Sequence, residues 1–221
     1  MTVICDNFAR VSARVAEAAV RSGRQPGEIT LVAVSKKQPV SAVEEVLACG
    51  ASDFGENYVQ EAADKREQVH SGRWHLLGHL QSNKAKVAVS LFDVIQSVDS
   101  LKLARALGRQ AIESGKVQKI LLQVHLGDEE TKFGLLPETA LDTAAEVALL
   151  PGIVLHGFMG IAPFGEVARP YFRQLRSLFD AMPAANAQTL SMGMTGDFEV
   201  ALEEGATLIR IGTAIFGPRT P

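Results

Sequence analysis

The segment at residues 190–217, LSMGMTGDFEVALEEGATLIRIGTAIFG, places two short apolar runs on either side of a helical stretch. The runs at residues 189–192 and 207–211 have the composition of buried β-strands, and residues 197–204 have the mixed polarity of a surface helix. A strand, a helix and a second strand in this order are typical of a parallel sheet. Each strand-like run is also followed by a glycine-rich turn.

The same alternation continues toward the N-terminus. Further strand-like runs lie at residues 29–35, 51–55, 74–78, 94–98, 119–124 and 154–159. Helical stretches lie between them, at residues 40–49, 57–70, 83–91, 100–114, 137–149 and 167–181. About eight strand–helix repeats in a chain of this length predict an α/β fold with a closed (β/α)8 TIM barrel. The alternative is a doubly wound open sheet, but no GxGxxG motif follows the first strand to indicate a dinucleotide site.

An additional helix is expected before the first strand, at residues 4–22. Phe8, Val11, Val15 and Ala18 form an apolar stripe at helical spacing, and Gly23 can end the helix. No linker-like tract divides the chain, so residues 1–221 are expected to form a single domain.

The charge and composition exclude several classes of protein. The net charge is -3, which argues against nucleic acid or an anionic membrane as a partner. The sequence has no secretory signal and no apolar run that could span a membrane, so a cytoplasmic protein is expected. Cys5 and Cys49 belong to no CxxC pair and are expected to be reduced thiols. No HExxH motif surrounds His75 and His79, so no metal site is predicted.

Lys36 follows the first strand-like run directly. Strand side chains alternate, so Val32, Val34 and Lys36 share one face, and Lys36 is expected to point inward at the C-terminal mouth of the barrel. Catalytic and binding groups of such barrels come from this end. The alternative is an ordinary solvated lysine, which is the expectation for Lys37.

Arg210 interrupts the apolar run at residues 207–211. If Ile209 and Ile211 face the helices, Arg210 faces the barrel interior, where a guanidinium needs an anion or a lone-pair acceptor. Either a ligand acceptor or an internal ion pair with a carboxylate would satisfy it.

The glycine-rich turns at residues 191–196 and 212–217 follow the seventh and eighth strands. Phosphate groups often bind at these two positions of a barrel, and both turns supply glycines and hydroxyl donors. A lysine amine, an interior arginine and a phosphate cradle together fit pyridoxal phosphate, which needs an amine for a Schiff base, a partner for the ring nitrogen and donors for the phosphate.

Four blocks extend this interpretation to a family resemblance. They are LVAVSKKQP (31–39), FGENYVQEAADK (54–65), WHLLGHLQSNKAK (74–86) and the block at 190–217 already quoted. With these blocks the sequence resembles the pyridoxal phosphate homeostasis proteins, also described as proline synthetase co-transcribed homologues. The resemblance covers residues 31–217 and implies a barrel like the N-terminal domain of alanine racemase.

The resemblance also implies roles for individual residues. It implies that Lys36 carries the cofactor, that Arg210 faces the pyridine nitrogen, and that Ser191, Gly212 and Thr213 contact the phosphate. Asn57 and Met192 resemble pocket residues, Met192 near the ring. One position departs from the family pattern, because Val124-His125 stands where the family commonly has an asparagine after the aliphatic residue. No pocket role is therefore assigned to His125.

The family resemblance favours a non-catalytic protein that binds, buffers or delivers pyridoxal phosphate inside the cell, with apoenzymes that use this cofactor as possible recipients. The β-domain that supplies the second base of alanine racemase has no counterpart in the sequence, and an arginine leaves the pyridine unprotonated. The same absence favours a monomer. One alternative is an amino acid racemase of weak or unusual specificity. Another is a barrel that binds a different phosphorylated metabolite.

Overall fold

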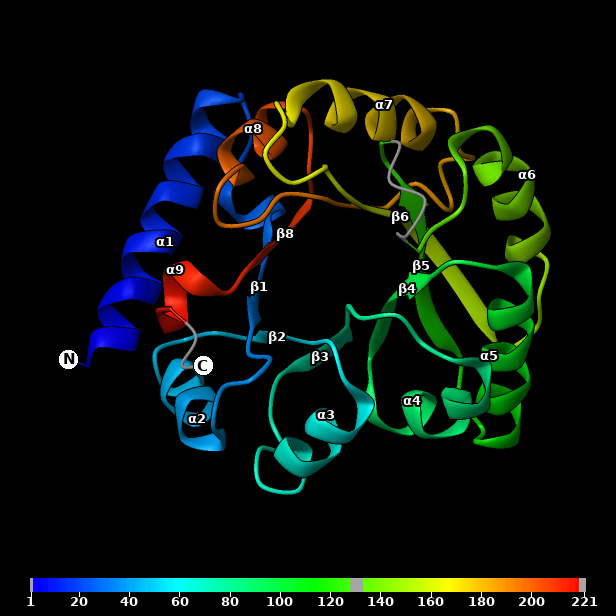
Figure 1. Cartoon of the computed structure of the whole chain (residues 1–221), viewed down its shortest axis with the longest axis horizontal. Coiled ribbons are helices and arrows are strands. Elements are labelled where there is room, and N and C mark those ends of the chain that lie inside the picture. Colours follow the sequence, from blue (N-terminus) through cyan, green and yellow to red (C-terminus); the bar gives the residue numbers. More distant parts are fainter. Residues whose placement is uncertain (1, 128–132, 219–221) are drawn as a thin grey trace.

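Eight parallel strands form a closed barrel in the computed structural model, which describes residues 2–127 and 133–218 (Figure 1). In chain order the strands are β1 Thr30–Val34, β2 Asp53–Glu56, β3 Arg73–Leu76, β4 Val94–Val98, β5 Gln118–His125, β6 Ile153–Ile161, β7 Thr189–Ser191 and β8 Leu208–Ile211. Each strand pairs with its neighbours in sequence, and β1 pairs with β8 over the registers Thr30↔Leu208 to Ala33↔Ile211. The predicted (β/α)8 barrel is therefore confirmed, and the open-sheet alternative is excluded.

Helices surround the barrel and connect successive strands (Figure 1). They are α2 Val40–Ala48, α3 Val59–Arg66, α4 Ala85–Leu91, α5 Leu101–Glu113, α6 Pro137–Ala148, α7 Arg169–Asp180 and α8 Phe198–Glu203, and the short α9 Thr213–Phe216 follows β8. Two 3₁₀ turns, Pro26–Glu28 and Ser82–Lys84, precede β1 and α4. Within the described residues no helix is long and apolar enough to cross a membrane.

The extra N-terminal helix is α1, Val3–Arg21, and it begins at Thr2, whose hydroxyl accepts a hydrogen bond from the Cys5 amide. Its buried stripe includes the predicted Val11, Val15 and Ala18. The helix packs against α2, α8 and α9. The Asn7 side-chain amide donates to the Ile215 carbonyl at 3.0 Å, so α1 is tied to the helix that follows the last strand.

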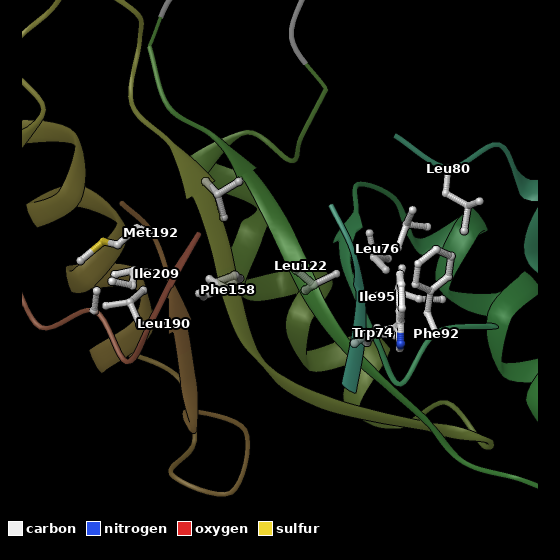
Figure 2. Close-up of a cluster of buried hydrophobic side chains, with 14 of the residues drawn as sticks. Trp74, Leu76, Leu80, Phe92, Ile95, Leu122, Phe158, Leu190, Met192 and Ile209 are labelled. Atoms are coloured by element: carbon white, nitrogen blue, oxygen red, sulfur yellow. The ribbon is translucent and has the colours of Figure 1, made fainter. Parts of the chain in front are cut away.

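The main apolar layer lies between the barrel and the helices. Outward-facing strand residues are fully buried there, among them Phe54. Figure 2 shows four others, Trp74, Ile95, Phe158 and Ile209. Phe54 and Trp74 occupy paired positions of β2 and β3, with ring centroids 5.3 Å apart. Because side chains alternate along a strand, the neighbouring residues point into the barrel lumen.

The two cysteines correct one expectation. Cys5 in α1 and Cys49 at the end of α2 lie with their Cα atoms 5.6 Å apart, within the range of disulfide partners, and their sulfurs are paired. The expectation of two separate reduced thiols is therefore wrong for this structure. Sequence spacing could not reveal the pair, because only the packing of α1 on α2 brings the cysteines together.

Candidate functional site

A cavity of about 360 Å³ opens at the C-terminal ends of the strands. It has a suitable size for a small-molecule ligand. Five of the seven residues predicted from the sequence line it, namely Lys36, Asn57, Arg210, Gly212 and Thr213. The other lining residues are Val34, Leu77, Met159, Ile161, Phe164, Met194, Thr195 and Gly196.

Lys36 stands two residues beyond the end of β1, and the backbone before it is fixed by a buried ion pair. Lys65 Nζ donates to the Ser35 carbonyl at 2.6 Å and to Glu56 Oε1 at 2.7 Å. The Ser35 hydroxyl donates to the same Glu56 oxygen at 2.6 Å. Burial raises the pKa of Glu56, although the hydrogen bonds from Lys65 and Ser35 oppose that shift.

The backbone after Lys36 is held as well. The Lys37 amide donates to Glu61, which also accepts from Lys65 Nζ at 2.8 Å. Lys37 has a φ of 60°, a left-handed conformation uncommon for lysine. The chain therefore turns sharply at this point, and its direction is set from both sides of Lys36.

Arg210 lies at the floor of the cavity, and its side chain is 4% exposed. Its guanidinium donates to the Ser191 hydroxyl at 2.6 Å and to the Gly160 carbonyl at 2.9 Å. Burial lowers the pKa of Arg210 to about 10, with Asp197 opposing that shift, so the group stays cationic at neutral pH. Within the described part of the chain Arg210 forms no salt bridge, so the internal ion pair considered above is not what satisfies it there.

Two loops bring hydroxyl and backbone donors to the same cavity. After β7 the chain turns at Gly193, whose φ of 94° and close approach to Ala201 leave no room for a side chain. The turn directs Thr195 and Gly196 to the cavity, opposite Gly212 and Thr213 at the end of β8. The chemistry of this donor set suits a phosphate group.

Asn57 follows β2 and lies at the cavity, where its backbone packs closely against Gly78 of the loop after β3. A Cβ on Gly78 would lie 2.1 Å from the Asn57 carbonyl oxygen. Only glycine permits this approach, which fixes the position of Asn57 at the cavity wall.

Ser191 and Met192 do not line the cavity. Ser191 is fully buried in the lumen beneath Arg210, and its hydroxyl donates to Gln96 Oε1 at 2.6 Å. Met192 is fully buried in the outer apolar layer, beside Leu190 and Ile209 in Figure 2. Thr195 and Met159, which were not predicted from the sequence, do line the cavity.

The three histidines noted in the sequence lie outside the cavity wall. His75 is buried between Asp53 and Gln96, His79 pairs with Asp99 and stacks on Phe133, and His125 ends β5. Among the described residues no cluster of histidine, cysteine or acidic side chains could hold a metal ion.

Comparison with known proteins relates this geometry to proteins already described. The family model "Alanine racemase, N-terminal domain" matches residues 9–220. The pyridoxal phosphate homeostasis protein of Pseudomonas aeruginosa is 42% identical over 99% of this chain and 97% of its own length. The protein of the same name from Escherichia coli K12 is 40% identical over 99% of this chain and 98% of its own length.

A solved structure agrees with these sequence matches. PipY of Synechococcus elongatus, determined with pyridoxal phosphate bound, is 40% identical, superposes with a TM-score of 0.79, and is matched over 92% of this chain and 100% of its own.

Proposed function

Since this chain belongs to the family of pyridoxal phosphate homeostasis proteins, we propose that it binds pyridoxal 5′-phosphate in the cavity at the barrel mouth, as a Schiff base on Lys36. The single observation that carries this proposal is that Lys36, Arg210 and the two hydroxyl-bearing glycine loops line one cavity. An amine, a ring-nitrogen partner and phosphate donors are the three requirements of this cofactor.

Each residue has a role in the proposed complex. The cofactor supplies an aldehyde that the Lys36 amine can hold covalently. Arg210 donates a hydrogen bond to the ring nitrogen, and Thr195, Gly212 and Thr213 donate to the phosphate. Asn57 orients the ring from the cavity wall. Ser191 supports Arg210 from below, and it takes no part in phosphate binding.

The composition of the cavity favours a carrier over an enzyme. Among the described lining residues only Lys36 and Arg210 are ionisable, and the arginine keeps its proton. A two-base racemase needs a second group that exchanges a proton. The two tyrosines lie elsewhere: Tyr58 precedes α3, and Tyr171 in α7 donates to Glu166. We therefore propose binding, buffering and delivery of the cofactor in the cytoplasm by a monomer, with recipient apoenzymes as partners.

The test combines a visible absorbance spectrum with borohydride reduction and peptide mapping. We expect the protein mixed with pyridoxal phosphate to absorb in the visible range and to carry the reduced adduct on Lys36. Lys36→Ala should lose the Lys36 adduct, and Lys37→Ala, altered at the neighbouring exposed lysine, should keep it. A protein that stays colourless and untrapped would instead indicate a barrel for another phosphorylated metabolite.

A second assay separates the carrier from the racemase alternative. Pure protein loaded with pyridoxal phosphate is incubated with single-enantiomer amino acids, and chiral chromatography follows the opposite enantiomer. The proposal predicts no robust turnover. Turnover that disappears in Lys36→Ala would establish a racemase.

A further inference from the structure

The barrel lumen is polar along one continuous path. Barrel interiors are usually filled by layers of branched apolar side chains. Here five buried polar side chains point inward, one each from β2, β3, β4, β7 and β8, and none is more than 4% exposed. We call them the lumen network: Asp53, His75, Gln96, Ser191 and Arg210. Such groups destabilise a protein unless each finds a partner.

Four hydrogen bonds connect the network from the cavity to the opposite end of the barrel. Arg210 donates to the Ser191 hydroxyl at 2.6 Å, and that hydroxyl donates to Gln96 Oε1 at 2.6 Å. Gln96 Nε2 lies 2.9 Å from His75 Nδ1, and His75 Nε2 lies 2.9 Å from Asp53 Oδ1. The path crosses the lumen between β7 and β4, which are not neighbours in the sheet.

Each end of the network has only one possible hydrogen-bonding role. Arg210 can only donate. At the other end, burial raises the pKa of Asp53, but hydrogen bonds from His75, Arg73 and Ser52 outweigh it and lower that pKa to about 2. Asp53 is therefore ionised and can only accept.

With the ends fixed, the orientation of Gln96, whose Nε2 faces His75 Nδ1 and can only donate, gives the groups between them one consistent arrangement. His75 must carry its proton on Nε2 to donate to Asp53, so its Nδ1 accepts from the Gln96 amide. The Gln96 oxygen then faces Ser191 and takes its hydroxyl proton, which leaves a Ser191 lone pair directed at Arg210. The His75 tautomer therefore follows from the orientation of the Gln96 amide.

Asp53 anchors the far end. Its Oδ2 accepts from Arg73 at 2.9 Å and from Ser52 at 2.7 Å, at the start of β2 and β3. Since each bond in such a row polarises the next, the Asp53 charge also strengthens the acceptor that Ser191 presents to Arg210.

We propose that Gln96 and His75 are positioning residues for the cofactor site, which act through Ser191 to hold the Arg210 guanidinium toward the ring nitrogen. The inference rests on the proposed binding of pyridoxal phosphate. Without an oriented Ser191 oxygen, Arg210 keeps one described acceptor, the Gly160 carbonyl. A guanidinium held at one point can rotate away from the ring, and the hydrogen bond to the ring nitrogen is weakened.

The experiment compares pyridoxal phosphate with its 1-deaza analogue, in which C–H replaces the ring nitrogen. The ratio of the two dissociation constants reports the ring-nitrogen contact and cancels effects on the phosphate and on Lys36. In the wild-type protein we expect pyridoxal phosphate to bind about tenfold or more tightly than the analogue, the value of one hydrogen bond to a charged group. In Gln96→Leu the ratio should fall to near one.

A matched control is available in β5. Gln118 is buried to the same degree and donates to the carbonyls of Phe92 and Asp93, outside the network. Gln118→Leu makes the same chemical change and should keep the wild-type ratio. Ser191→Ala removes one atom from the link next to Arg210. It should lower the ratio as Gln96→Leu does, and it serves if the leucine variant fails to fold.

The outcomes separate this inference from the proposed function. If the wild-type protein prefers pyridoxal phosphate and folded Gln96→Leu or Ser191→Ala keeps that preference, the positioning role is wrong and the proposed function stands. If the wild-type protein binds both compounds equally, Arg210 does not contact the ring nitrogen and the inference fails. If it binds neither, the proposed function fails and the inference fails with it.

Discussion

Replacing Arg210 by methionine separates the cost of burying its charge from its value to the ligand. Burial lowers the pKa of Arg210 from its ordinary value to about 10, so keeping the group charged in the folded protein costs on the order of 3 kcal/mol. Arg210 is a base, so its lowered pKa decides at which pH the burial cost is present. The cost is fully present at every pH below the folded pKa and declines only as the pH rises through about 10. A measurement at neutral pH therefore includes all of it.

The methionine variant removes this cost together with two hydrogen bonds, to Ser191 and Gly160. Each such bond to a charged group contributes about 1.5–3 kcal/mol. The two effects largely cancel. For the ligand-free Arg210→Met protein we therefore expect the free energy of unfolding to fall by no more than about 3 kcal/mol, as measured by urea denaturation.

Ligand binding should respond far more strongly. Loss of one charge-assisted hydrogen bond to the ring nitrogen should raise the dissociation constant for pyridoxal phosphate by roughly 10- to 150-fold, measured by absorbance titration. Arg176→Met, the same change at an arginine paired with Asp180 on the surface of α7, is the control and should leave affinity unchanged. Unchanged affinity in Arg210→Met would refute a ligand contact. A stability loss above about 4 kcal/mol would show that the guanidinium is mainly structural support.

Three further predictions concern other parts of the molecule. Thr195→Ala should weaken binding of pyridoxal phosphate by about five- to tenfold and leave pyridoxal unaffected, and equal losses in parallel titrations would contradict a phosphate contact. Lys65→Met should lower the free energy of unfolding by about 3–5 kcal/mol, because it leaves the buried Glu56 carboxylate without its cation. Because burial raises the pKa of Glu56, its carboxyl group binds a proton more strongly in the folded variant than in the unfolded chain. Urea denaturation should therefore find the Lys65→Met protein more stable at mildly acidic than at neutral pH. The reverse trend would exclude this explanation. Reduction of the Cys5–Cys49 pair, separated by 44 residues, should lower the free energy of unfolding by up to about 4 kcal/mol, and thiol titration of the denatured, unreduced protein should find no free thiol.

The sequence was sufficient to predict the barrel because short apolar runs alternate with segments whose apolar residues recur at helical spacing. Arg210 was predicted from the alternation of side chains within β8, and Lys36 by continuing the alternation of β1 two residues past its end. The same rule was not applied to Ser191 and Met192, which were both expected to line the site. Adjacent strand residues face opposite sides, so the two could not both line the site, and the turn at Gly193 that directs Thr195 into the cavity depends on a backbone conformation.

The lumen network could not have been predicted from the sequence. Gln96 and Ser191 are 95 residues apart, and their contact exists only because the sheet closes and places β4 across from β7. A buried glutamine has no sequence signature that distinguishes it from an exposed one.

The closure of the sheet has a consequence for how the protein is made. Strand β1 can pair with β8 only after residue 208 has left the ribosome, and the Asn7–Ile215 hydrogen bond spans 208 positions. Until then β1 carries an open, apolar edge of the kind that associates with other chains. Lys36, which follows β1, and Arg210, which lies in β8, are on the two sides of this last seam. We therefore expect the ligand site to be assembled only after β8 has been synthesised, and slow translation of the segment between β1 and β8 to prolong the aggregation-prone stage.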